Sequence, residues 1–197
     1  MIDVCNKHYK LYVKQYTMLK VIGKVIVVLV TLCTISGTTK NDSGLTDRAP
    51  VPIILDTDME SDVDDVGALA MLHALADLGE TELLGVMVCA ENPWSTLCAD
   101  RINTYFNREN LPLGQLKGPG VNRESHYARQ VAEEFPGTLE DAHDAPGAVD
   151  QYRKILAERP DNSVVLLSIG YLTNLRNLII SEPDQYSDLN GRELVEK

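Results

Sequence analysis

Short apolar runs that alternate with segments of helical periodicity constrain this chain more than any other feature. The runs lack the polar alternation of a half-exposed strand, which is typical of strands covered on both faces. Strands that alternate with helices favour parallel pairing. We therefore predict an α/β fold with an open, mostly parallel Rossmann-like sheet and helices on both faces. The predicted strands are 51–55, 83–89 and 164–169, and the predicted helices are 66–78, 96–106, 130–135, 148–158 and 172–180.

Residues 1–37 show the order of features found in a signal peptide. Lysines precede an apolar segment, residues 21–35, which is followed by small residues. This segment is shorter than the ~20 residues that a membrane-spanning helix needs, so a permanent anchor is not favoured. Residues 38–50 have the composition of a linker, and a folded domain is predicted over 51–197. We expect an exported protein, periplasmic or extracellular, that meets the membrane only through its signal peptide.

The charge distribution argues against nucleic acid as a partner. The chain carries 18 Lys and Arg residues against 29 Asp and Glu residues, a formal net charge of −11. Affinity for nucleic acid depends largely on Lys and Arg that neutralise phosphates, and no basic stripe follows residue 50. Nucleic acid is therefore an unlikely partner. The sequence leaves the oligomeric state open, a homo-oligomer included.

Cysteine usage gives no sign of a disulfide framework or of zinc. Once a signal peptide is removed, Cys89 and Cys98 are the remaining cysteines. Two cysteines are too few for a framework in a domain of this size, and their spacing has no matching pair of histidines. We expect buried or free thiols.

Six carboxylates fall within ten residues, where the first predicted strand ends and the first predicted helix begins. They are Asp56, Asp58, Glu60, Asp62, Asp64 and Asp65. One or two acids there would simply favour the helix dipole, each by about 0.3 to 1 kcal/mol. Six would repel one another if desolvated together, and a bound cation relieves such repulsion. Because the donors are all oxygens, the pattern favours a hard ion, and Ca²⁺ tolerates the irregular geometry of adjacent carboxylates.

Two other acidic motifs fit the spacing less well. A helix-loop-helix calcium loop that starts at Asp56 would need a glycine at its sixth position and an acid at its twelfth, where the chain has Ser61 and Gly67. A phosphohydrolase of the DxD type could use Asp56 as its nucleophile together with Asp58. In such enzymes, the position that Glu60 occupies in this chain usually holds a threonine that follows a glycine. The phosphohydrolase stays as the less favoured alternative.

Three motifs resemble the inosine/uridine-preferring nucleoside hydrolase family. The first is DTD at 56–58 followed by DD at 64–65, with a loop two residues longer than the commonest family form. The second is CAEN at 89–92, where the family usually has a small-Gly-Asn ending. The third is SIGYLTN at 168–174, close to the family's Gly-Pro-Leu-Thr-Asn turn. The motifs come in the family's order, each at the end of a predicted strand, and the resemblance covers residues 51–180.

The resemblance implies a role for each matched residue. Asp58 would ligate calcium and act as general base on a metal-bound water, and Asp65 would bind the ion with both carboxylate oxygens. The backbone carbonyl of Ile169 would be a further ligand, which places no demand on its side chain. Asp64 and Asn92 match the positions that hold the ribose hydroxyls.

These roles suit cleavage of an N-glycosidic bond. Departure of the base builds positive charge on the sugar ring, which nearby carboxylates stabilise, while calcium anchors the diol and lowers the pKa of the attacking water. The resemblance therefore implies calcium-dependent hydrolysis of ribonucleosides or related ribosyl compounds. Base preference is left open, because residues 118–123 stand where many members have a His-Gly-Asp segment.

The chain ends at Lys197, before the positions of the family's further acidic calcium ligand and of a sugar-binding segment. The resemblance thus implies a truncated domain, incomplete at its C-terminus, with an incomplete ion shell. The competing hypothesis is a catalytically inactive module that binds a metal or a sugar and turns over nothing. An assay for ribose release from nucleosides separates the two.

Overall fold

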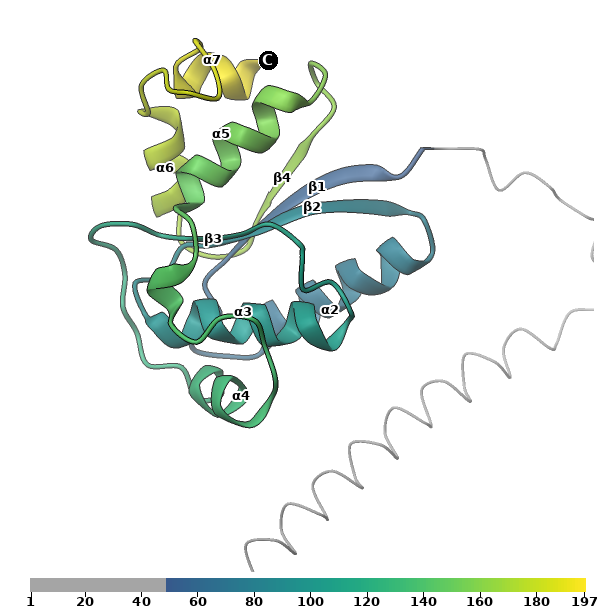
Figure 1. Ribbon diagram of the computed structural model, residues 1–197, viewed down its shortest axis with the longest axis vertical. Coiled ribbons are helices and arrows are strands. Elements are labelled where there is room, and N and C mark those ends of the chain that lie inside the picture. Colours follow the sequence, from purple (N-terminus) through teal and green to yellow (C-terminus); the bar gives the residue numbers. More distant parts are fainter. Residues whose placement is uncertain (1–48) are drawn as a thin grey trace, which may run out of the picture. The chain divides into compact units, whose positions relative to one another are not determined.

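The computed structural model describes residues 49–197 (Figure 1). The predicted signal peptide and nearly all of the predicted linker therefore lie outside the described residues. Within the described part of the chain, no helix combines the length and the apolar character needed to cross a membrane.

Four parallel strands form one open sheet with the order β3-β2-β1-β4. β1 pairs with β2 on one side and with β4 on the other, and β3 pairs with β2. These pairings confirm the predicted α/β fold with a parallel sheet. The strands are β1 (Val51–Thr57), β2 (Thr81–Val88), β3 (Leu113–Gln115) and β4 (Val165–Ser168), and the helices are α2 (Asp64–Asp77), α3 (Pro93–Tyr105), α4 (Ala128–Glu134), the short 3-10 helix η1 (Ala142–Asp144), α5 (Ala148–Glu158), α6 (Thr173–Ile179) and α7 (Gly191–Glu196).

Helices cover both faces of this sheet, as the sequence predicts (Figure 1). On one face, Leu55 of β1 shares an apolar cluster with Leu69 of α2 and Ile102 of α3. On the other face, Ile54 of β1 packs in a cluster with Tyr152 of α5 and with residues of α6 and α7. Successive residues of a strand point to opposite faces, so a strand buried on both faces reads as an unbroken apolar run.

The observed boundaries differ from the predicted ones where polar groups decide them. β1 ends at Thr57 and not at residue 55, so Asp56 is part of the strand. α3 begins at Pro93 and not at residue 96, because the side chain of Asn92 caps the helix by accepting a hydrogen bond from the amide of Trp94 at 3.1 Å. β3, whose three residues pair with β2 and bridge to Gly147 through Gln115, is not predicted from the sequence.

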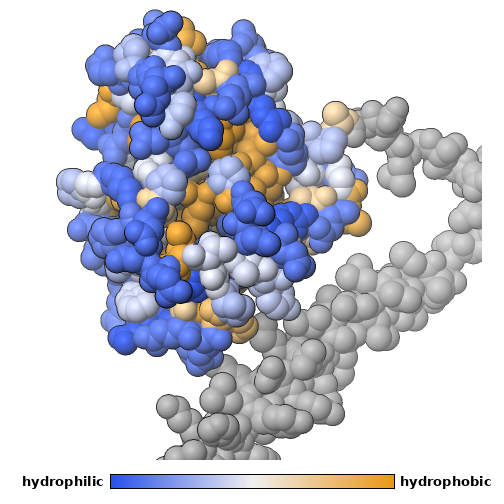
Figure 2. Space-filling model, viewed as in Figure 1, coloured by the Kyte–Doolittle hydropathy of each residue, from blue (hydrophilic) through white to orange (hydrophobic). Residues whose placement is uncertain are grey.

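Apolar side chains remain exposed on α2 and around β4. Met71 on α2 and Leu78 just after it are 63% and 75% exposed, and Val165 and Leu172 are 46% and 68% exposed. Figure 2 shows an apolar band between the layer formed by α5, α6 and α7 and the layer formed by α2, α3 and α4. The described helices therefore leave part of the apolar surface uncovered.

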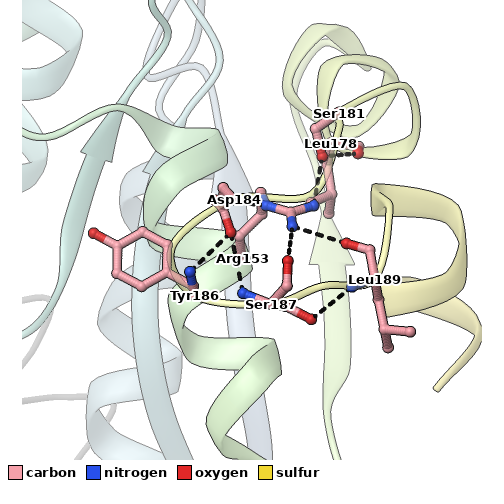
Figure 3. Close-up of polar contacts among 7 residues, drawn as sticks. All are labelled: Arg153, Leu178, Ser181, Asp184, Tyr186, Ser187 and Leu189. Atoms are coloured by element: carbon pink, nitrogen blue, oxygen red, sulfur yellow. Dashed lines mark hydrogen bonds and ion pairs between the residues drawn. The ribbon is translucent and has the colours of Figure 1, made fainter.

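A buried arginine of α5 holds the segment that precedes α7 (Figure 3). The Nε atom of Arg153 lies 2.7 Å from Oδ2 of Asp184, and its Nη1 donates to Oγ of Ser181 at 2.9 Å. Its Nη2 donates to the carbonyls of Ser187 and Leu189 at 3.1 and 2.9 Å. One guanidinium therefore fixes a segment that has neither strand nor helix of its own.

Candidate metal and substrate site

The carboxyl ends of β1, β2 and β4 meet at one edge of the sheet, and the three sequence motifs lie there. The carbonyl of Thr57 accepts a hydrogen bond from the amide of Cys89, just after β2, at 2.9 Å. The carbonyl of Asp56 accepts one from the amide of Ile169, just after β4, also at 2.9 Å. This edge is where ligands bind in open parallel sheets. The fold thus brings together motifs that lie far apart in the sequence.

Asp58 and Asp65 are joined through the backbone at the end of β1. The amide of Asp58 lies 3.4 Å from Oδ1 of Asp65, and the same oxygen accepts a hydrogen bond from the hydroxyl of Thr57. Oδ1 of Asp58 accepts a hydrogen bond from the amide of Glu60 at 2.9 Å. Asp65 is buried and Asp58 is half-buried. Both carboxylates are therefore held in place by donors from their own loop.

Burial raises the pKa of Asp58 and the pKa of Asp65, and neighbouring negative charges, including that of Asp64, raise both further. A cation beside the two carboxylates would oppose this shift. Ile169, which follows β4 at the same edge of the sheet, carries a backbone carbonyl that could serve as a third oxygen. A donor set of carboxylate and carbonyl oxygens fits a hard ion such as Ca²⁺.

The six carboxylates do not form the single crowded cluster that the sequence suggests. Asp56 and Glu60 are fully buried and have hydrogen-bond donors of their own, whereas Asp62 and Asp64 are exposed. The strand and the turn after it direct these side chains to different sides. Across residues 49–197, no three Asp, Glu, His or Cys side chains are grouped so as to hold a metal ion.

Glu60 anchors the loop after β1 to two other segments, a role that the sequence gives no signal for. Its Oε1 accepts a hydrogen bond from the amide of Arg123 at 3.0 Å, and its Oε2 accepts one from the hydroxyl of Tyr171 at 2.9 Å. Its neighbours Met59 and Ser61 have φ angles of 54° and 50°. Such angles are uncommon for residues other than glycine. The turn is thus held in its unusual conformation by buried bonds to Glu60.

The two predicted ribose-binding residues lie in different environments. Asp64 is exposed at the start of α2, and a hydrogen bond with Asp62 lowers the pKa of Asp64 and raises that of Asp62. Asn92 is buried, its Oδ1 caps α3 at the amide of Trp94, and its Nδ2 donates to the carbonyl of Arg123 at 3.2 Å. Asp64 is therefore accessible to a solute, while the side chain of Asn92 is already engaged by the protein.

Asp56 lies beneath the site, on the face of the sheet that α5 and α6 cover. Its Oδ2 accepts hydrogen bonds from the hydroxyl of Tyr152 and from Nδ2 of Asn174, and burial raises its pKa to about 6. A nucleophile must reach its substrate, so a fully buried Asp56 argues against the phosphohydrolase alternative. Asp56 does not cap α2 either, because the start of that helix has no side-chain cap.

Tyr127 is a further neighbour of the acidic pair that no sequence motif indicates. Its hydroxyl is buried and has no hydrogen-bond partner within the described residues. Burial raises the pKa of Tyr127, and the nearby thiol of Cys98 and the carboxylates of Asp65 and Asp58 raise it further. Burial has the largest effect on the pKa of Tyr127, and the negative charges of Asp65 and Asp58 add to it.

No protein-family model matches the chain, and no curated protein matches it either. The resemblance to nucleoside hydrolases therefore rests on the three sequence motifs alone.

Proposed function

We propose that this protein hydrolyses the N-glycosidic bond of ribonucleosides or related ribosyl compounds, with calcium as its cofactor. The convergence of β1, β2 and β4 is the observation that carries the proposal. It brings Asp58 and Asp65 to the edge of the sheet at which Ile169 follows β4. These are the residues to which the nucleoside hydrolase motifs assign the ion.

The carboxylates of Asp58 and Asp65 and the carbonyl of Ile169 would hold the ion. When bound, calcium supplies positive charge that anchors a ribose diol and lowers the pKa of a nearby water. Both carboxylates must be ionised to bind it, and the pKa of each is raised. Ion affinity is therefore expected to rise with pH as the two acids lose their protons.

Asp58 acts as the general base in this proposal. One of its oxygens is fixed by the amide of Glu60, and its raised pKa suits an acceptor that takes a proton from water near neutral pH. Asp64, exposed beside it, would accept hydrogen bonds from the ribose hydroxyls. Asn92 would join it by exchanging its bond to the Arg123 carbonyl for one to the sugar.

A panel of nucleosides assayed for released ribose, with calcium and with a chelator, tests the proposal. Asp58→Asn should lower kcat by at least 100-fold, the lower end of the usual contribution of a general base. Asp188→Asn is the matched control, because Asp188 is an exposed aspartate in the segment before α7, and the activity of this variant should equal that of the wild type. Full activity in the chelator, or in Asp58→Asn, would contradict the proposal.

A second candidate is a module that binds calcium or a ribosyl compound without turnover. One observation favours it: the side chain of Asn92, a residue expected to hold the ribose, is engaged by the protein itself. Titration calorimetry that detects binding of calcium or ribose, together with no ribose release from any nucleoside, would select this candidate.

We also propose that the protein is exported. The support comes from residues 1–37, in which lysines, an apolar segment and small residues follow one another as in a signal peptide. N-terminal sequencing of the protein recovered outside the cytoplasm tests this: an N-terminus near residue 38 is expected, and an uncleaved N-terminus would contradict the proposal.

A further inference from the structure

One buried carboxylate joins three elements beneath the candidate site. Asp56 belongs to β1, and its Oδ2 accepts a hydrogen bond from the hydroxyl of Tyr152 on α5 at 2.9 Å. The same oxygen accepts a second bond from Nδ2 of Asn174 on α6 at 3.0 Å. All three residues are fully buried. A single side-chain oxygen therefore links one strand to two helices that cover it.

The ends of β1 and β4 both depend on the position of Asp56. Its carbonyl accepts the hydrogen bond from the amide of Ile169, and Asp58 follows two residues later. The two strand ends are in close contact, since a Cβ atom on Gly170 would lie 2.7 Å from the amide nitrogen of Asp58 and 2.6 Å from Sγ of Cys89. A shift of Asp56 would therefore be transmitted to both strand ends.

Packing alone does not explain an acid at this position. Oδ1 of Asp56 is buried without a nitrogen or oxygen donor within the described residues, which is unfavourable, and the weakly donating thiol of Cys89 beside this carboxylate offsets only part of the loss. Neighbouring side chains in the same layer, such as Ile54, Met87 and Leu178, are apolar. An apolar side chain of similar volume would avoid this cost. The acid and its two donors instead make a directional connection that apolar contacts do not provide.

We propose that Asp56 is a positioning residue for the ion site. Through Tyr152 and Asn174 it anchors the end of β1 to α5 and α6, and so sets the separation between the carboxylate of Asp58 and the carbonyl of Ile169. Asp56 touches neither the ion nor the substrate. The inference rests on the proposed function, in which those two groups are ion ligands.

Calcium affinity, measured by titration calorimetry on the full chain, tests this inference. Groups that support metal ligands typically change affinity by about 10- to 100-fold when they are replaced. Asp56→Asn should therefore weaken calcium binding by at least about 10-fold. Tyr152→Phe and Asn174→Ala, which each remove a single donor, should weaken it in the same direction, and both remain informative if Asp56→Asn fails to fold.

Asp100→Asn is the matched control. Asp100 on α3 is also buried and accepts hydrogen bonds from Thr138 and Leu139, but it belongs to neither strand end of the site. Its replacement should lower the melting temperature and leave calcium affinity unchanged. Two results would overturn the inference and leave the proposed function standing. One is that the wild type binds calcium and that Asp56→Asn and Tyr152→Phe bind it as tightly as the wild type does. The other is that Asp100→Asn weakens calcium binding as much as Asp56→Asn does. If the wild type binds no calcium and releases no ribose, both the proposed function and this inference are contradicted.

Discussion

Gly170 is the residue at which the candidate site has the least room. A Cβ atom there would lie 2.7 Å from the amide nitrogen of Asp58 and 2.9 Å from the carbonyl carbon of Thr57, and backbone cannot move aside as a flexible side chain can. We expect Gly170→Ala to lower the free energy of unfolding by about 1 to 3 kcal/mol, the usual cost of overpacking. Urea denaturation measures the loss.

Gly67→Ala is the control for this substitution. Gly67 lies within α2, and a Cβ atom there would have nothing within 4 Å. Alanine is favoured over glycine inside a helix, so this variant should gain about 0.5 to 1 kcal/mol. Equal effects of the two variants would show that the strand ends are not tightly packed.

The chemistry of single residues can be read from the sequence only where it is local. Asp58 and Asp65 lie seven residues apart, so their spacing alone suggests a shared site. Tyr152 and Asn174 lie 96 and 118 residues from Asp56, and no local pattern marks them as its partners. Their meeting depends on how α5 and α6 pack on the sheet, which involves contacts that periodicity does not encode.

His73 joins α2 to α3 and gives this pair of helices a dependence on pH. It is fully buried, its Nε2 lies 3.0 Å from Oδ1 of Asn103, and its ring stacks on Phe106 with 4.6 Å between centroids. Burial lowers the pKa of His73, and the charge of Arg108 lowers it further. In the unfolded chain His73 takes up a proton near pH 6.5, while in the folded chain it takes one up only at lower pH, because its pKa is lowered. The stability that it contributes above pH 6.5 is therefore lost as the pH falls below that value.

We expect this loss to appear when wild type is compared with His73→Gln, which has no group that titrates. Urea denaturation at pH 7.5 and pH 5.5 gives the free energy of unfolding of both proteins. The raised pKa of Asp58 and of Asp65 acts in the opposite direction, because these acids favour the folded state as the pH falls, and it acts equally in both proteins. The wild type should lose more stability than His73→Gln between the two pH values. An equal change would mean that His73 titrates normally in the folded state.

At the scale of elements, every predicted strand and helix corresponds to an observed one, short ones included, but β3 and α7 are missed. The segment 66–78 predicts α2, which begins two residues earlier at Asp64. β3 and α7 are absent from the prediction because three and six residues carry too little periodicity. α7 does have a local signal in the capping box of Asn190 and Glu193, which a search for helix starts would find. β3 has none, since its pairing with β2 supplies its structure.

For the whole molecule, the alternation of strands and helices is enough to predict a parallel sheet with two helical layers. It does not predict the strand order β3-β2-β1-β4, which places β1 in the interior with a neighbour on each side. That placement decides which carboxyl ends meet. The central position of β1 also explains why the acids of residues 56–65 lie apart. The strand directs Asp56 into one helical layer, while Asp65 lies on the other side of the sheet, on α2.

Arg153 connects α5 to the segment that precedes α7, and its removal should destabilise this last part of the described chain. Without the guanidinium, the carboxylate of Asp184 and the carbonyls of Ser187 and Leu189 lose their buried donor. Breaking a buried pair usually costs about 3 to 5 kcal/mol. The side chain of Asp184 is 26% exposed and can be partly resolvated, so we expect Arg153→Met to lose about 2 to 3 kcal/mol of unfolding free energy.

Arg159→Met is the control, because Arg159, just after the same helix, makes an ion pair with Glu82 at the surface at 2.8 Å. Exposed pairs contribute at most about 1 kcal/mol, so this variant should differ little from the wild type. Hydrogen exchange followed by mass spectrometry should locate the larger loss in residues 181–197, which the guanidinium of Arg153 holds against α5. If both variants lost the same stability, or if exchange rose equally throughout the chain, the segment would be anchored by its apolar contacts and not by Arg153.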